Sequence, residues 1–89
     1  MQNEKIKILI VDDEPDILEV IEYNLLKDDY QVVRAANGKI ALEKAIAEKP
    51  NLILLDIMMP EMDGIEVCRE LRSLREFDNT IIAFLTARN

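Results

Sequence analysis

Hydrophobic and polar residues alternate along the chain in blocks that predict four strands and three helices. Short apolar runs without polar alternation predict strands that are covered on both faces, as in a parallel sheet. Apolar residues at helical spacing predict the helices between them. The predicted strands cover residues 8–11, 30–35, 52–55 and 80–85, and the predicted helices cover residues 15–28, 39–48 and 65–74.

The predicted strands differ in how deeply we expect them to be buried. Residues 52–55 are consecutive apolar residues between two prolines, which predicts a strand covered on both faces. Residues 30–35 mix β-branched and polar side chains, which is typical of an edge strand. Residues 80–85 are mostly apolar, and we expect a buried strand there. On the last predicted helix, one apolar face carries Ile65, Cys68, Leu71 and Leu74.

The predicted elements follow the order β-α-β-α-β-α-β, so a helix joins each strand to the next. Parallel strands joined in this way have right-handed crossovers and helices on both faces of the sheet. The pattern therefore predicts an α/β fold with a doubly wound parallel sheet of four strands and three helices.

The composition excludes several classes of function. At 89 residues the chain is one domain at most, and its net charge of −7 argues against nucleic-acid binding, which needs clustered Lys and Arg. The single cysteine, Cys68, excludes an intrachain disulfide and fits a reducing cytoplasm. We expect no signal sequence and no membrane span, because no apolar run is long enough. The chain has no histidine, so a histidine base, nucleophile or metal ligand is excluded.

Polar side chains follow three of the predicted strands. Asp12 and Asp13 come directly after the first strand, Asp56 follows the third, and Thr86 follows the fourth. In an open α/β sheet, ligands bind at the carboxyl ends of the strands. If these three strands are neighbours, we expect the four residues to converge at one edge of the sheet.

Such a group of carboxylates has a definite chemistry. Clustered negative charges repel one another unless a cation compensates them. Oxygen ligands favour a hard divalent ion, Mg²⁺ by preference, which can also bridge to a phosphoryl oxygen. One carboxylate can then attack phosphorus and form an acyl phosphate. Asp56 is the candidate nucleophile, and the hydroxyl of Thr86 can hydrogen-bond the new phosphoryl group.

Simpler interpretations of the same residues remain open. The acids at 12–14 also suit the positive end of a helix, although capping needs only one of them. Asp56 alone can be a turn residue, and Asn37-Gly38 and Asp63-Gly64 are typical of turns and helix caps.

Three competing functional classes do not fit the sequence. A dehalogenase-type phosphatase needs Asp-x-Asp after its first strand, whereas Asp12 and Asp13 are adjacent. The chain carries neither a glycine-rich nucleotide-binding loop nor the oxygen ligands of an EF-hand.

Four stretches of the chain carry a family resemblance. They are Ile8-Leu9-Ile10-Val11-Asp12-Asp13-Glu14-Pro15, Ala36-Asn37-Gly38, Leu54-Leu55-Asp56-Ile57-Met58-Met59-Pro60-Glu61-Met62-Asp63-Gly64 and Leu85-Thr86-Ala87. In this order and spacing the chain resembles the receiver domain of two-component response regulators over nearly its whole length. The resemblance implies the CheY-like, flavodoxin-like form of the doubly wound sheet, with a receiver domain over residues 1–89.

The resemblance also implies a role for each site residue. Asp56 accepts a phosphoryl group from a phosphohistidine on a sensor histidine kinase. Asp13 ligates Mg²⁺ directly, Asp12 mostly through water, and Asp56 and the backbone carbonyl of Met58 complete the protein ligands. Thr86 is the switch hydroxyl that moves toward the phosphoryl group. Such a domain assists its own phosphorylation and dephosphorylation and is not an enzyme on an external substrate, and the finer resemblance favours a DNA-binding output domain that regulates transcription.

The chain departs from the family pattern at its carboxyl end. The family has a further helix, strand and helix after the fourth strand, together with a lysine that pairs with the phosphoryl group, and we expect this chain to lack them. Arg88 is the nearest cationic candidate. Because an apolar edge strand favours pairing with another chain, we expect a homo-oligomer or a domain-exchanged dimer. The alternative function is a receiver-derived scaffold that folds by self-association and is not phosphorylated.

Overall fold

The computed structural model describes residues 5–85, and within them it contains the predicted strands and helices and one short 3-10 helix. The strands are β1 (Lys7–Val11), β2 (Gln31–Ala35), β3 (Leu52–Asp56) and β4 (Ile81–Leu85). The helices are α1 (Pro15–Lys27), α2 (Gly38–Glu48), α3 (Gly64–Arg72) and the 3-10 helix η1 (Arg75–Phe77). None of these helices is both long enough and apolar enough to cross a lipid bilayer.

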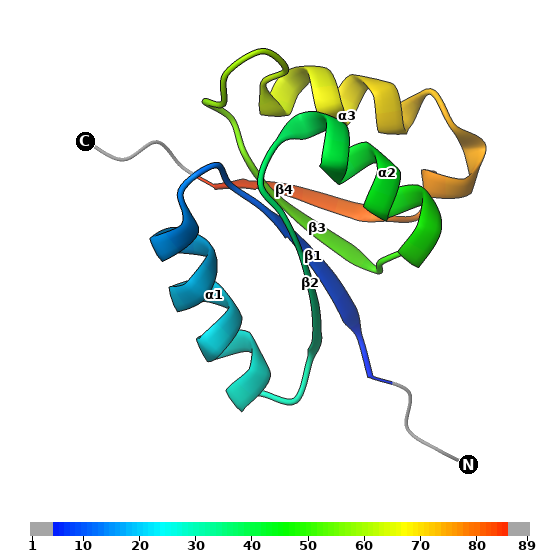
Figure 1. Cartoon of the computed structure of the whole chain (residues 1–89). Coiled ribbons are helices and arrows are strands. Elements are labelled where there is room, and N and C mark those ends of the chain that lie inside the picture. Colours follow the sequence, from blue (N-terminus) through cyan, green and yellow to red (C-terminus); the bar gives the residue numbers. More distant parts are fainter. Residues whose placement is uncertain (1–4, 86–89) are drawn as a thin grey trace.

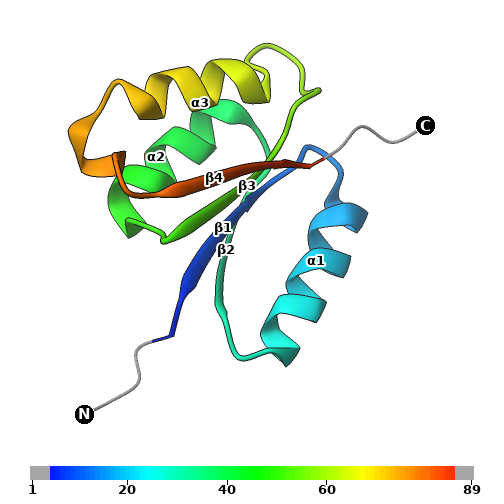
Figure 2. The same cartoon turned by 180° about the vertical axis from the view of Figure 1, so that it is seen from behind.

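The strands form one parallel sheet in the order β2-β1-β3-β4. This order confirms the doubly wound sheet and the edge position predicted for β2. In Figure 1, α1 lies on one face of the sheet, and α2 and α3 lie side by side on the other. Figure 2 shows the same two layers of helices from behind. β1 and β3 are therefore the central strands, and their carboxyl ends are adjacent.

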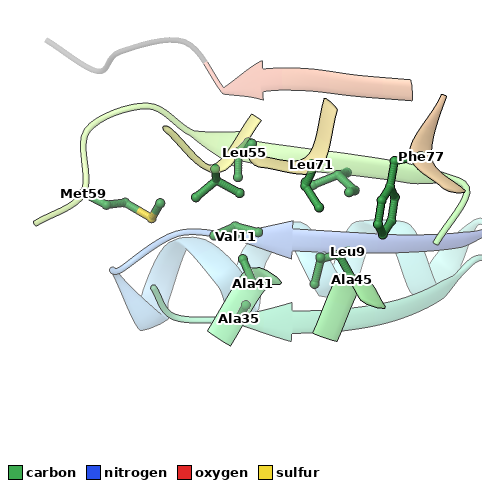
Figure 3. Packing of buried hydrophobic residues seen from close by; sticks show 11 residues of the cluster. Leu9, Val11, Ala35, Ala41, Ala45, Leu55, Met59, Leu71 and Phe77 are labelled. Atoms are coloured by element: carbon green, nitrogen blue, oxygen red, sulfur yellow. The ribbon is translucent and has the colours of Figure 1, made fainter. Parts of the chain in front are cut away.

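Two hydrophobic cores hold the layers together, because successive residues of a strand point to opposite faces of the sheet. The larger core lies under α2 and α3, and Figure 3 shows Val11 and Leu55 of the central strands facing side chains from those helices. Its buried members are Leu9, Val11, Ala35, Ala41, Ala45, Ile53, Leu55, Met59, Val67, Leu71 and Phe77. The smaller core lies under α1, and its buried members are Ile8, Ile10 and Leu18.

The 3-10 helix η1 is a feature that the sequence pattern did not indicate. It turns the chain from α3 back to β4 and places Phe77 in the larger core with only 1% of its surface exposed. The guanidinium of Arg72 donates a 2.7 Å hydrogen bond to the carbonyl oxygen of Phe77 and so ties this turn to the end of α3. A turn of three residues is too short to show a hydrophobic period.

The prediction that residues 80–85 form a buried strand is wrong in its burial. Ile81 is 64% exposed and Phe84 is 37% exposed, and none of the other β4 residues is fully buried. Within the described residues β4 pairs only with β3, and Ile82 is the one β4 residue that packs against a core cluster. An apolar strand is buried only where elements cover its faces and its edge.

The predicted apolar face of the last helix is also wrong in part. Ile65 is 42% exposed and Leu74 lies beyond the end of α3, whereas Val67 and Leu71 are fully buried. The helix begins at Gly64, which is itself buried against the end of β3, and this contact sets the face that the helix turns to the sheet. Cys68 lies at the margin of that face, partly buried.

Candidate functional site

Three carboxylates meet at the carboxyl ends of the two central strands. Val11 pairs with Leu55, so Asp12, the first residue after β1, lies beside Asp56, the last residue of β3. One carboxylate oxygen from each of Asp12, Asp13 and Asp56 lies within 4.8 Å of the others. The expected grouping of the three acids is therefore present.

The three acids differ in exposure. Asp12 and Asp56 are buried, with 0% and 1% of their surface exposed, whereas Asp13 is exposed to solvent. Burying two neighbouring carboxylates is costly unless a cation or hydrogen bonds compensate their charge. A group of oxygen donors with one member open to solvent fits a hard divalent cation that enters from that side.

Backbone N–H groups orient both buried carboxylates. Asp12 Oδ1 accepts a 2.9 Å hydrogen bond from the N–H of Glu14, and Asp56 Oδ1 accepts a 3.2 Å hydrogen bond from the N–H of Met58. In each case the donor lies two residues further along the chain, which is the Asx-turn arrangement. The loops after β1 and β3 thus hold the two side chains in defined orientations.

Helix capping does not account for the acids at 12–14. The N-cap residue of α1 is Glu14, and its side chain makes no capping hydrogen bond. Pro15 at the first helical position supplies the start of α1 instead. A side-chain capping hydrogen bond at α1 therefore does not explain these acids.

The predicted turn and cap chemistry is confirmed at α2 and α3. Asn37 Oδ1 accepts a 2.8 Å hydrogen bond from the N–H of Ile40 and caps α2. Asp63 and Glu66 form a capping box at α3, in which each side chain accepts a hydrogen bond from the backbone N–H of the other. Both capped helix starts lie next to the loop that follows Asp56.

The remaining predicted site residues are described only in part. Thr86 and Arg88 lie outside the described residues. Leu85, the residue before Thr86, pairs with Asp56 in the sheet. The backbone N–H of Met58 donates a hydrogen bond to Asp56, and 68% of the surface of Met58 is exposed. The role of the Met58 carbonyl as a metal ligand stays a prediction.

The sequence pattern missed one residue that touches this site. A side chain at Gly64 would collide with the backbone of Asp56. The pattern Asp63-Gly64 indicated only a cap, because no local signal shows which strand the start of a helix packs against.

Comparison with known proteins gives a consistent result. The family model described as response regulator receiver domain matches residues 8–89. The chain is 54% identical over 66 residues to the alkaline phosphatase synthesis transcriptional regulatory protein PhoP of Bacillus subtilis, a match that covers 74% of this chain and 28% of that protein. The chain thus spans about a quarter of the length of this curated relative.

Solved structures resemble the fold closely. The chemotaxis response regulator CheY4 of Vibrio cholerae aligns with a TM-score of 0.91 at 32% identity, over 97% of this chain and 72% of that one. A chain from the complex of the histidine kinase ThkA with the response regulator protein TrrA aligns with a TM-score of 0.84 at 38% identity, over 94% of this chain and 71% of that one.

Proposed function

Since the chain belongs to the family of response regulator receiver domains, we propose that Asp56 accepts a phosphoryl group from a sensor histidine kinase and thereby controls an output domain. The observation that carries the proposal is the grouping of Asp12, Asp13 and Asp56 within 4.8 Å at one edge of the sheet. One of the similar solved structures is a complex that contains a histidine kinase, and a similar curated protein is named as a transcriptional regulator. We therefore propose a kinase as the donor, transcription as the output and the cytoplasm as the location.

The residues that would hold Mg²⁺ are Asp12, Asp13, Asp56 and the backbone carbonyl of Met58. By the family resemblance, Asp13, which is exposed, would ligate the ion directly, and Asp12, which is buried, mostly through water. When bound, the ion compensates the charge of the carboxylates and of the incoming phosphoryl oxygens. The donor set contains only hard oxygen ligands, which is what Mg²⁺ prefers.

In the proposed reaction the Asp56 carboxylate attacks the phosphorus of the phosphohistidine. A new P–O bond forms while the P–N bond breaks, and the imidazole nitrogen keeps the bonding electrons and takes up a proton from solvent. The N–H of Met58 holds Oδ1 and so orients the carboxylate for attack. Thr86 follows the residue that pairs with Asp56, and we propose that its hydroxyl hydrogen-bonds the phosphoryl group as the switch.

We propose that the domain also removes its own phosphoryl group. Attack of water on the acyl phosphate returns the free carboxylate and releases inorganic phosphate, so the domain resets itself without acting on an external substrate. This makes it a phosphoacceptor that assists its own chemistry.

Intact-mass spectrometry after incubation with acetyl phosphate and Mg²⁺ tests the proposal. We expect one phosphoryl adduct on the wild type, no adduct on Asp56→Asn, and an adduct on the control Asp63→Asn. The control makes the same chemical change at the end of the loop that follows Asp56, and asparagine caps a helix as well as aspartate does. A folded wild type that takes up no phosphoryl group would overturn the proposal and leave the scaffold alternative, which no contact within residues 5–85 favours.

We also propose that the chain self-associates through β4, which within residues 5–85 pairs with β3 alone. At the other edge of the sheet, β2 carries the charged residue Arg34, whose carbonyl oxygen accepts a 2.7 Å hydrogen bond from Lys44 Nζ, and both features oppose pairing there. β4 carries no charged residue, and its Ile81 is 64% exposed. Such an edge favours pairing with a second copy about a twofold axis, or the exchange of a segment between two copies.

Analytical ultracentrifugation at micromolar concentration tests this association. We expect the wild type to sediment as a dimer or larger and Ile81→Lys to sediment as a monomer, because a lysine on an edge strand opposes pairing. Val20→Lys is the control, since Val20 is as exposed as Ile81 but lies on α1. A monomeric, sharply melting wild type contradicts the proposal.

A further inference from the structure

Both glycines of the chain occupy the first position of a helix. Gly38 begins α2 and Gly64 begins α3, and neither has a positive φ. Any L-residue can adopt their backbone conformation, so the usual conformational reason for a glycine does not apply. In a helix an alanine is favoured over a glycine, so local propensity alone would select against glycine at both positions. The reason for each glycine must lie in what its missing side chain would touch.

Gly64 lies directly against the backbone of the candidate phosphoacceptor. A Cβ atom added at Gly64 would overlap the carbonyl oxygen of Asp56 and come within 2.9 Å of the Cα of Ile57. Real Cβ atoms essentially never approach another atom closer than 3.0 Å. These are backbone atoms and not the ends of flexible side chains, so a larger residue can fit only if the chain itself moves.

The start of α3 is poorly placed to move away. The capping box of Asp63 and Glu66 fixes its first turn, and the N–H of Gly64 donates a 2.9 Å hydrogen bond to the carbonyl oxygen of Ile57. The helix is anchored further by Val67 and Leu71, both fully buried in the larger core. An added side chain at Gly64 therefore strains the contact between α3 and the end of β3, and we expect part of the resulting shift to fall on the peptide that joins Asp56 to Ile57.

Gly38 makes a similar contact with the other side of the same loop. A Cβ atom at Gly38 would lie 2.9 Å from Cβ, Cγ and the carbonyl oxygen of Met62. The loop between them is tightly turned, since Glu61 has a φ of 70° and the N–H of Met62 donates a 2.7 Å hydrogen bond to the carbonyl oxygen of Pro60. The loop that carries Met58 is thus held between the starts of two helices.

We propose that Gly64 is a positioning residue for Asp56, and that Gly38 assists it by holding the loop at Met62. The close approach of α3 fixes the Asp56–Ile57 peptide, and with it the direction of the carboxylate toward Asp12 and Asp13. This inference rests on the proposed function, which it deepens by naming residues that set the geometry of the same site. Neither glycine contacts the reacting atoms, and both act through the backbone.

The test compares Gly64→Ala with Phe77→Ala. Phe77 is buried in the same core but lies on η1, so its truncation destabilises the fold without pressing on Asp56. Mg²⁺ affinity is measured by calorimetry and the rate of acetyl phosphate labelling by mass spectrometry, at a temperature where both variants are folded. We expect Gly64→Ala to weaken Mg²⁺ binding about 10-fold and to slow labelling about 100-fold. Phe77→Ala should lower the melting temperature and leave the Mg²⁺ dissociation constant unchanged.

The possible results separate the positioning role of Gly64 from the proposed function itself. A Gly64→Ala variant that loses stability but binds Mg²⁺ and is labelled like the wild type overturns the positioning role. If Gly64→Ala does not fold, Gly38→Ala takes its place, and we expect a smaller loss of Mg²⁺ affinity in the same direction, since part of its clash is with a side chain. An unchanged affinity in folded Gly38→Ala then overturns the proposal. A folded wild type that neither binds Mg²⁺ nor is labelled refutes the proposed function itself.

Discussion

Replacing Asp56 with asparagine should stabilise the protein when no divalent cation is present. Asparagine has the shape of aspartate and keeps the oxygen that accepts the hydrogen bond from Met58, so the change opens no cavity. It removes one of two buried negative charges, since Asp12 and Asp56 are 0% and 1% exposed. The exposed Asp13 adds a weaker, better screened repulsion.

The size of the effect follows from the separation of the charges. The carboxylate oxygens lie within 4.8 Å of one another, and at an effective dielectric constant of about 20 two unit charges at that distance repel by roughly 3.5 kcal/mol. The hydrogen bond from Met58 to a neutral amide is weaker than one to a carboxylate by about 1 kcal/mol. The net increase in the free energy of unfolding should be about 2.5 kcal/mol, which for a domain of this size raises the melting temperature by about 10 °C or more.

Thermal unfolding of the wild type and Asp56→Asn in EDTA, followed by circular dichroism, measures this difference. Asp78→Asn serves as the control, because it removes an equal charge from an exposed position away from the cluster. Saturating Mg²⁺ should reverse the order, since a ligand at 1,000 times its dissociation constant stabilises the wild type by about 4.1 kcal/mol. An Asp56→Asn variant that is no more stable than Asp78→Asn in EDTA would refute the reasoning, because the buried acids would then not repel.

Two further predictions concern the elements that support the site. Phe77→Ala should lower the free energy of unfolding by about 3–5 kcal/mol in urea titrations, because the ring is 1% exposed and fills the larger core under η1; a loss below about 1 kcal/mol would show that the turn does not depend on this anchor. Asp63→Ala should cost about 0.5–2 kcal/mol by removing the capping box of α3, whereas Asp63→Asn should cost almost nothing. Equal losses in the two Asp63 variants, measured in the same titrations, would show that the cap does not hold the helix.

The sequence predicted the sheet well because its signals are local. Each strand and helix is a continuous run with its own period, and the order β-α-β restricts the possible topologies to a few. The cluster of Asp12, Asp13 and Asp56 followed from the same rule, since the ends of parallel strands meet at one edge. Residues placed by strand ends are therefore predictable from sequence.

The predictions that were wrong concern features that depend on which elements are neighbours in space. The apolar pattern of β4 indicated burial, but burial depends on neighbours that the pattern does not contain, and Ile81 is exposed. The face of α3 was misjudged because Gly64 packs on the end of β3, a contact that no local pattern contains. The burial of Phe77 was not predicted, because this residue lies in a turn too short to show a hydrophobic period.

Identifying the phosphorylated residue by chemical trapping tests most directly the claim that Asp56 is the phosphoacceptor. The wild type is incubated with acetyl phosphate and Mg²⁺, the acyl phosphate is reduced with borohydride, and the modified residue is found by peptide mass mapping. The account predicts that reduction converts position 56, and only that position, to homoserine. Conversion at position 12 or 13, or at none in the folded protein, would contradict the account.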